Sequence, residues 1–147
     1  MLVNLLLGLS TMAVCLMFQS ILLIVALRYY SNHMYLVNSP SLISSLIVVN
    51  SVMMLLIIGN LAQLTIWAII FWILGEFSEL REAIYHSAVN FATLGYGDFV
   101  MSDQHKFLGP LEAINGVLMI GVTTATLMSV FQDTMRKTMD ARNIQKP

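Results

Sequence analysis

Charged residues are scarce in this sequence. Only 10% of its 147 residues are charged, whereas 58% are hydrophobic. A soluble domain of this length needs far more charge to cover its surface. The one cysteine, Cys15, rules out a disulfide within the chain. Because the apolar residues also occur in long runs, we predict an all-α integral membrane protein.

Several kinds of functional motif are also missing. No nucleophile stands beside a base, and no phosphate-binding loop or basic stripe is present, so we expect neither an enzyme nor a nucleic-acid-binding protein. The histidines His33, His86 and His105 lack the spacing of a metal site. No run carries Arg or Lys at every third position, which excludes a voltage sensor of the usual kind. We expect no cofactor, and membrane lipid as a partner.

The first apolar run, residues 2–27, is long enough to span a membrane, because a spanning helix needs roughly 20 apolar residues. The run is about twice as long as the apolar part of a signal peptide, and no basic residue precedes it. We therefore predict a retained N-terminal transmembrane helix at 1–28. A linker at 29–40, which contains a Ser-Pro step, is expected to follow.

A second apolar run predicts a long outer helix at 41–77. Such a helix would be roughly 50 Å long at about 1.5 Å per residue. It must therefore tilt, break near Gly59 and Asn60, or project from the membrane. Asn50, Asn60 and Gln63 are expected to hydrogen-bond neighbouring helices.

The next helix, predicted at 78–92, is too short and too polar to cross a membrane. Ser78 is a suitable N-cap for it. Glu79 and Glu82 fall in the first turn, where the helix dipole favours acidic side chains. We interpret this segment as a short re-entrant helix.

The last apolar run predicts an inner helix at 110–135, with Pro110 at its first position. A loop at 99–109 precedes this helix and a short tail at 136–147 follows it. Arg28 directly precedes the linker and basic residues dominate the tail, whereas acidic residues dominate 76–106. The positive-inside rule therefore places the linker and the tail in the cytoplasm, and the loop and the N-terminus outside.

The segment between the re-entrant and inner helices has a backbone that suits a cation. It comprises Thr93, Leu94, Gly95, Tyr96, Gly97 and Asp98. Backbone carbonyls replace the water of a dehydrated cation only if successive residues aim them at one axis. Gly95 and Gly97 can reach the left-handed dihedrals that this requires, and the Thr93 hydroxyl adds a further oxygen. One chain supplies one wall of such a ring, so we expect a symmetric homo-oligomer.

This segment resembles the potassium-channel signature T-V-G-Y-G-D, and the resemblance extends over about 67–132. The chain is thereby similar to the bacterial ion channel pore-domain family. That family implies a homotetramer with a K⁺ selectivity filter at 93–98, in which Tyr96 points away from the pore and braces the filter. The implied K⁺ ligands are the carbonyls of Thr93, Leu94, Gly95 and Tyr96, with the Thr93 hydroxyl. The sequence departs from the usual pattern at Leu94, where a β-branched residue is common.

Three residues of the re-entrant helix are expected to support the filter. Tyr85 stands eight residues before the filter threonine, where the family often has an aromatic residue bonded to the filter aspartate. The resemblance therefore implies a hydrogen bond between Tyr85 and Asp98, with simple packing of Tyr85 as the alternative. His86 and Asn90 lie where a partner for the Tyr96 hydroxyl would be expected.

Glu112 is an acidic residue inside a predicted span, which makes it a functional candidate. One interpretation is a hydrogen bond to the re-entrant helix near Ser87 or Asn90. This bond would replace a glutamate that some relatives carry where this chain has Val89. The alternative is a side chain that reaches water at the membrane interface.

The inner helix carries the candidates for a hinge and a cavity. Gly116 lies where the family's hinge glycine usually falls, and Gly121 follows five residues later. Both glycines could equally serve close helix packing. Val117, Ile120 and Thr124 fall on one face and are expected to line an aqueous cavity.

The sequence thus predicts a subunit of a K⁺-selective channel that conducts passively, in a bacterial inner (plasma) membrane. A weakly selective cation channel and a non-conducting regulatory subunit are the alternatives. The gate could lie at the filter, at an inner-helix crossing near 128–132, or under the control of lipid or a partner. The first helix is expected to pack at the periphery of the pore.

Overall fold

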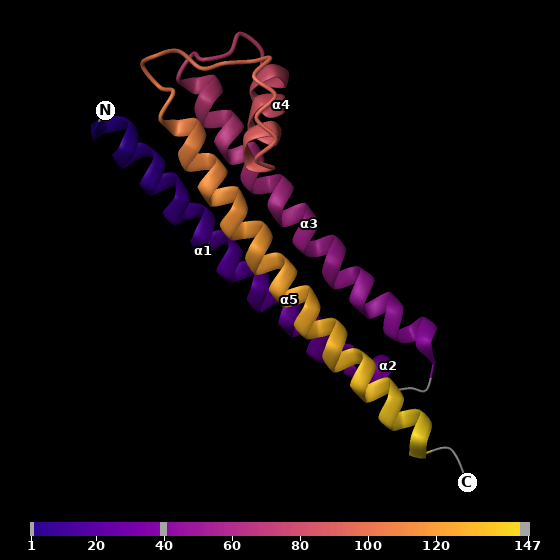
Figure 1. The fold of residues 1–147 in the computed structure, drawn as a ribbon. Helices are drawn as coiled ribbons and strands as arrows, with labels where there is room; N and C mark the ends of the chain where they lie inside the picture. The colour runs from indigo at the N-terminus through magenta and orange to yellow at the C-terminus, as the bar shows by residue number, and fades with distance from the viewer. Residues whose placement is uncertain (1, 39–40, 145–147) are drawn as a thin grey trace. The chain divides into compact units, whose positions relative to one another are not determined.

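The computed structural model describes residues 2–38 and 41–144, and helices make up most of this part of the chain (Figure 1). The helices are α1 (Leu2–Asn32), α2 (Met34–Val37), α3 (Leu42–Ile73), α4 (Leu80–Phe91) and α5 (Leu108–Ile144). Of these, α1, α3 and α5 are long and apolar enough to cross a membrane. No strand occurs within the described residues, and the predicted all-α fold with three spanning helices is confirmed.

The chain between α1 and α3 is more helical than predicted. α1 continues to Asn32 instead of ending at residue 28, because Tyr30 is buried in the core and keeps the last turn packed. After His33, α2 adds one turn inside the predicted linker. The predicted Ser-Pro step at 39–40 lies outside the described residues, as do residue 1 and residues 145–147.

α3 is one unbroken helix, so the break considered near its middle does not occur. It ends at Ile73 rather than at residue 77. Gly75 has a φ of +74°, its N–H donates to Trp72, and the N–H of Glu76 donates to Phe71 at 3.1 Å. This pair of bonds is the arrangement by which a left-handed glycine commonly ends a helix.

α4 spans Leu80–Phe91 instead of the predicted 78–92, and its N-cap lies one residue later than predicted. Glu79, not Ser78, is the N-cap, with an extended backbone (φ −117°, ψ 141°) and no capping bond from its side chain. The carbonyl of Glu79 accepts from Glu82 at 3.1 Å, which closes the first turn. Glu82 lies in the first turn as predicted.

α5 is longer than the predicted inner helix at both ends. It begins at Leu108, so Pro110 is its third residue rather than its first. A proline is tolerated there because the N–H groups of the first turn have no partner within the helix. The helix also continues through most of the predicted tail. Asp133 pairs with Arg136 and Lys137, three and four residues later, which stabilises this extension.

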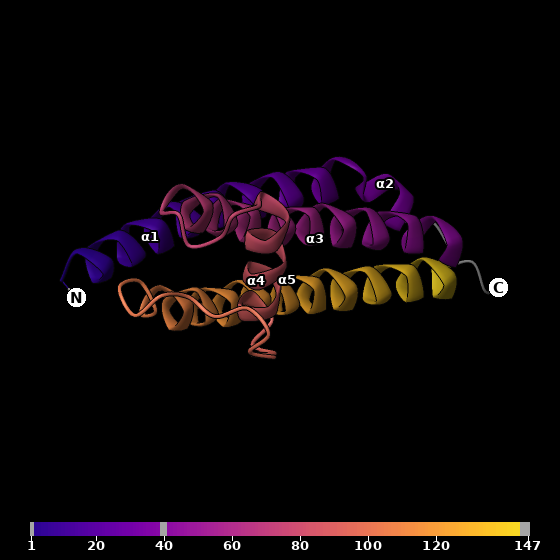
Figure 2. The same cartoon turned by 90° about the horizontal axis from the view of Figure 1, so that it is seen from above.

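The described chain forms two compact units, and the first contains the residues up to Gln19 together with Gly59–Gly121. Its buried core comprises Cys15, Trp67, Ala68, Phe71, Phe77, Ala83, Met101 and Leu108. Within this unit α4 lies against α3 and the first part of α5, with the loop 92–107 beside it (Figures 1 and 2). Because Ala83 of α4 belongs to the core, packing fixes the re-entrant helix in place.

The second unit contains Ser20–Ile58 and the described residues from Val122 onward. Its buried core comprises Ala26, Tyr30, Val37, Val48, Val52, Leu56 and Val130. These side chains come from α1, α2, α3 and α5. The short helix α2 is therefore packed against the long helices through Val37.

The buried face of α1 consists mainly of small and polar residues, whereas most of its large apolar side chains are exposed. The buried positions are Asn4, Gly8, Thr11, Cys15, Gln19, Ala26 and Tyr30. They recur at intervals of three, four or seven residues, so they form one stripe along the helix. The exposed side chains include Leu6, Leu9 and Met17. In a membrane this pattern directs apolar side chains toward lipid and small or polar ones toward protein.

Gln19 and Gln63 join α1 to α3 in the first unit. Gln63 Nε2 donates to Gln19 Oε1 at 2.6 Å, and both side chains are buried. The expected hydrogen bond from Gln63 to a neighbouring helix is therefore confirmed, whereas Asn50 is exposed within the chain.

Replacing Gln63 by Leu should lower the free energy of unfolding by about 1–2 kcal/mol, because the Gln19 carbonyl loses a buried donor. The double variant Gln19→Leu/Gln63→Leu should recover most of this loss, since neither polar group remains. Thermal unfolding of the purified protein in detergent measures both. A double variant as unstable as the sum of the single ones would contradict this account.

Candidate functional site

Residues 93–98, the candidate filter segment, form non-helical backbone after the end of α4. Their φ is positive at every second position: 57° at Thr93, 59° at Gly95 and 77° at Gly97. The two glycines adopt the left-handed region predicted for them, at little steric cost. Alternation between left-handed and ordinary dihedrals allows successive carbonyls to point to one side of the chain, as a carbonyl filter requires.

The sequence does not predict the positive φ of Thr93, because left-handed dihedrals cost a residue with a Cβ about 1–2 kcal/mol. The cause lies in the end of α4. The N–H of Thr93 donates to the Asn90 carbonyl at 2.9 Å, and that of Leu94 donates to the Val89 carbonyl at 2.8 Å. This is the helix-ending arrangement that glycine usually makes. The residue that terminates α4 is therefore also the first residue of the filter segment.

The predicted hydrogen bond between Tyr85 and Asp98 is present, with the Tyr85 hydroxyl donating to Asp98 Oδ2 at 2.7 Å. This bond raises the pKa of Tyr85, so the hydroxyl keeps its proton and remains a donor. It ties the C-terminal end of the filter segment to α4.

His86 makes a second connection between α4 and the residues after the filter segment. Its Nδ1 lies 3.0 Å from the Phe99 carbonyl, and its Nε2 lies 2.8 Å from Asn90 Nδ2. A carbonyl only accepts and an amide nitrogen only donates, so these partners select the neutral tautomer with its proton on Nδ1. Burial lowers the pKa of His86, which is consistent with a neutral ring.

The predicted role of His86 and Asn90 as partners of the Tyr96 hydroxyl stays a prediction. Their polar atoms bond each other and the Phe99 carbonyl, and no hydrogen bond of Tyr96 occurs in the described part of the chain. Tyr96 is 66% exposed within the chain. His86 and Asn90 instead line a cavity of about 410 Å³ that also borders Gly95 and other filter residues.

Glu112 lies behind α4 and is fully buried. It hydrogen-bonds Ser87, one of the two partners considered for it, and the alternative of reaching water does not hold within the chain. The Ser87 hydroxyl also donates to the Leu64 carbonyl at 2.6 Å. One hydroxyl has one proton to donate, so both bonds form together only if Glu112 carries a proton of its own. α4 is thus connected to α3 and α5 through a single serine.

Gly116 packs against the end of α4. A Cβ at this position would lie 2.1 Å from the carbonyl oxygen of Phe91, which is closer than any real contact. Around Gly121 a Cβ would meet nothing within 4 Å. Of the two interpretations left open for these glycines, the geometry favours packing at Gly116, and α5 continues through both positions without a break.

The expected cavity residues of α5 are accessible in the single chain. Val117 is 56% exposed and Ile120 is 41% exposed, and Thr124 is also exposed. Their exposure is compatible with the predicted lining of a pore, and this role stays a prediction.

Sequence reasoning missed the contacts that hold the loop before α5. Glu76, just after α3, accepts hydrogen bonds from the backbone and hydroxyl of Ser102, each at 2.6 Å, and contacts His105 Nδ1. Asn4 of α1 donates to the Gln104 carbonyl. No local pattern links residues so far apart in the sequence. The loop is therefore fastened to the ends of two spanning helices.

These observations define the class of the protein. Three helices suited to a membrane, a re-entrant helix and a segment of alternating dihedrals together form the pore architecture of an ion channel subunit, in an integral membrane protein. The sequence model described as "Ion channel" matches residues 60–133, half of the chain, so the chain belongs to the ion channel family. This confirms its resemblance to the potassium-channel pore-domain family. Comparisons with the curated proteins and with the solved structures gave no match.

Glu76 should make the stability of the protein depend on acidity. Burial opposes the charged form of Glu76, but hydrogen bonds from Ser102 and His105 outweigh it, and the net effect lowers its pKa below the usual 4.5. Its contribution is therefore complete above pH 4.5 and is lost as the pH falls through the lowered pKa. Glu76→Gln should cost about 1–2 kcal/mol at pH 7 and progressively less under acid. Thermal unfolding at a series of pH values tests this, and a constant difference would contradict it.

Gly116→Ala should destabilise the protein by about 1–3 kcal/mol, because the added methyl group meets rigid backbone. Gly121→Ala is the matched control. With open space around it, it should be neutral or slightly stabilising, since alanine is the better helix former. Thermal unfolding midpoints of the two variants, measured in the same detergent, compare their stabilities. Equal effects would show that Gly116 is not a close-packing position.

Proposed function

We propose that this chain is one subunit of a homotetrameric, potassium-selective channel that conducts K⁺ passively. The observation that carries the proposal is the positive φ at every second residue of the filter segment. In the proposed assembly the carbonyls of the first four filter residues and the Thr93 hydroxyl replace the water around K⁺. The proposed ligands are Thr93, Leu94, Gly95 and Tyr96.

Several copies must assemble in this proposal because one chain cannot close a pore around an ion. A single filter segment supplies one wall of a pore, and non-helical backbone at membrane depth must border protein or water. Leu94 is 54% exposed in the single chain, like Tyr96 beside it. Four copies related by symmetry would cover these side chains and close the ring of carbonyls. The exposed face with Val117 and Ile120 would then line the cavity below the filter.

The contacts around the filter segment support a fixed geometry. Tyr85 and His86 hold its outer end, at Asp98 and Phe99. The end of α4 holds its inner end at Thr93. A filter that distinguishes K⁺ from Na⁺ by its carbonyls needs them at set positions and in set number. In this proposal Tyr96 braces the filter against a neighbouring subunit.

The distribution of charge supports one orientation in the membrane. Acidic residues outnumber basic ones around the filter and its loop, whereas the other basic residues are Arg28, near the end of α1, and four residues beyond Asp133. The N-terminus would then lie outside and the C-terminus in the cytoplasm of a bacterial plasma membrane.

Reconstitution of the full chain into lipid bilayers with a gradient of KCl against NaCl tests the proposal. The reversal potential should lie close to the K⁺ equilibrium potential. In Gly97→Ala this selectivity should be lost, because alanine resists a φ of +77°.

Gly75→Ala is the matched control for this experiment. Gly75 has a φ of +74° and open space around it, like Gly97, but lies outside the filter segment. The backbone of Gly75→Ala should be strained about as much as that of Gly97→Ala, but the channel should still select K⁺. A reversal potential near zero in the wild type would indicate a weakly selective cation channel. No current at all would indicate a regulatory subunit.

A further inference from the structure

Tyr30 of α1 connects to the cytoplasmic half of α5, and we propose that it is a positioning residue that holds α5 in the conducting position. This inference rests on the proposed function and concerns its regulation. The family match covers residues 60–133 and includes neither α1 nor α2. The connection is therefore a feature that this chain adds to the matched pore.

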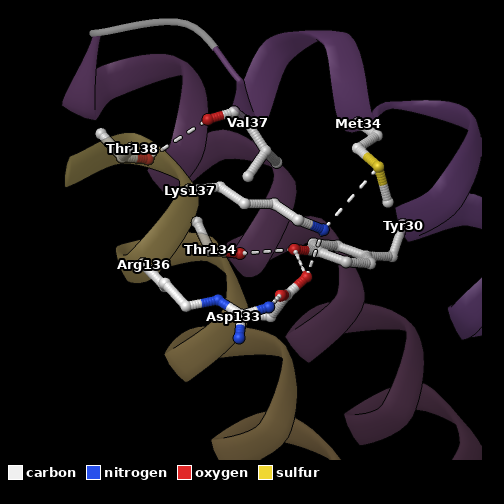
Figure 3. Close-up of polar contacts among 8 residues, drawn as sticks. All are labelled: Tyr30, Met34, Val37, Asp133, Thr134, Arg136, Lys137 and Thr138. Atoms are coloured by element: carbon white, nitrogen blue, oxygen red, sulfur yellow. Dashed lines mark hydrogen bonds and ion pairs between the residues drawn. The ribbon is translucent and has the colours of Figure 1, made fainter. Parts of the chain in front are cut away.

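The polar contacts converge on Tyr30 and Asp133 (Figure 3). The Tyr30 hydroxyl donates to Asp133 Oδ2 at 2.8 Å and accepts from Thr134 Oγ1 at 3.3 Å. Lys137 bonds Asp133, and its Nζ lies 5.5 Å from the centre of the Tyr30 ring. We refer to Tyr30, Asp133 and Thr134 as the Tyr30 cluster.

Tyr30 is the one member of this cluster that belongs to α1, whereas Asp133 and Thr134 belong to α5. Arg136 and Lys137 also pair with Asp133, but both belong to α5, and within the described chain Lys137 reaches outside α5 only through a weak contact with Met34 Sδ at 3.7 Å and its position over the Tyr30 ring. Among the described residues, the Tyr30 hydroxyl is the polar group that Asp133 meets from another helix. Removing this hydroxyl therefore removes the hydrogen bonds of Tyr30 to α5 without leaving Asp133 unpaired.

A second attachment lies one turn further along α5. The Thr138 hydroxyl bonds the Val37 carbonyl of α2 at 3.3 Å and lies 2.7 Å from the Ser45 hydroxyl of α3. Thr134 and Thr138 are both buried. Short polar side chains at buried positions give α5 a few discrete bonds that can break and reform, besides the apolar packing around Val130.

The position of the cluster on α5 sets the direction of its effect. Asp133 follows Thr124 by nine residues, about two and a half turns at 3.6 residues per turn, so the two lie on opposite sides of the helix. In the proposed channel Thr124 faces the pore. The bond from Tyr30 therefore pulls this part of α5 away from the pore axis and opposes closure by convergence of the inner helices.

Tyr30→Phe is the direct test, because it removes the hydroxyl and keeps the ring that packs in the core. In single-channel recordings of the reconstituted protein, its ratio of open to closed time should fall about tenfold, equivalent to about 1.4 kcal/mol. The reversal potential should stay unchanged. Tyr29→Phe is the matched control, since the neighbouring Tyr29 stacks on His33 and its hydroxyl takes no part in the cluster. An unchanged or increased ratio in Tyr30→Phe, or an equal fall in Tyr29→Phe, would overturn the proposal.

A second variant and a second readout keep the test independent of folding and of conduction. Thr134→Val removes the donor to the Tyr30 hydroxyl and should lower the same ratio by a smaller factor. If Tyr30→Phe does not assemble, Thr134→Val tests the proposal in its place.

Met139 is exposed on the same part of α5, so a nitroxide label on Met139→Cys reports distances between copies by pulsed electron resonance. Tyr30→Phe should shift these distances to shorter values, and an unchanged distribution would overturn the proposal. If the wild type carries no selective current, the proposed function fails while this distance measurement still tests the Tyr30 cluster.

Discussion

Backbone that is not helical cannot face lipid, and the structure of this protein depends on how it meets that constraint for residues 93–98. α4 ends with Thr93 in a left-handed conformation, which turns the chain directly into the filter segment. Ser87 links α4 to α3 and α5, and Gly116 lets α5 approach the end of α4. The bundle thus holds both ends of the segment, and the proposed neighbouring subunits provide the remaining cover.

Much of this arrangement is predictable from the sequence, because the relevant signals are local. Two glycines at alternate positions predict the left-handed dihedrals of the filter segment, and the resemblance to the potassium-channel family implies the bond between Tyr85 and Asp98. The ends of the helices are predicted less well, since burial of Tyr30 extends α1. The contacts of Glu76 with the loop before α5 could not be predicted. They join residues 26 and 29 positions apart, and only the folded chain brings them together.

Polar side chains of the long helices connect one helix to another part of the protein. In α1 they form a stripe that faces protein, so that Asn4, Gln19 and Tyr30 each bond a different partner. Lipid offers no hydrophobic drive for helices to associate, which makes such bonds and close packing the means of assembly. α1 is therefore an integral part of each compact unit to which it contributes, although the ion channel family match begins after it.

The central claim is that four copies of this chain surround K⁺ with backbone carbonyls. A cryo-electron microscopy structure of the full chain in lipid nanodiscs with KCl tests that claim most directly. The account predicts a fourfold particle with the carbonyls of Thr93 to Tyr96 facing one axis, and density for ions between them that weakens when NaCl replaces KCl. A different number of copies, or carbonyls directed away from a common axis, would contradict it.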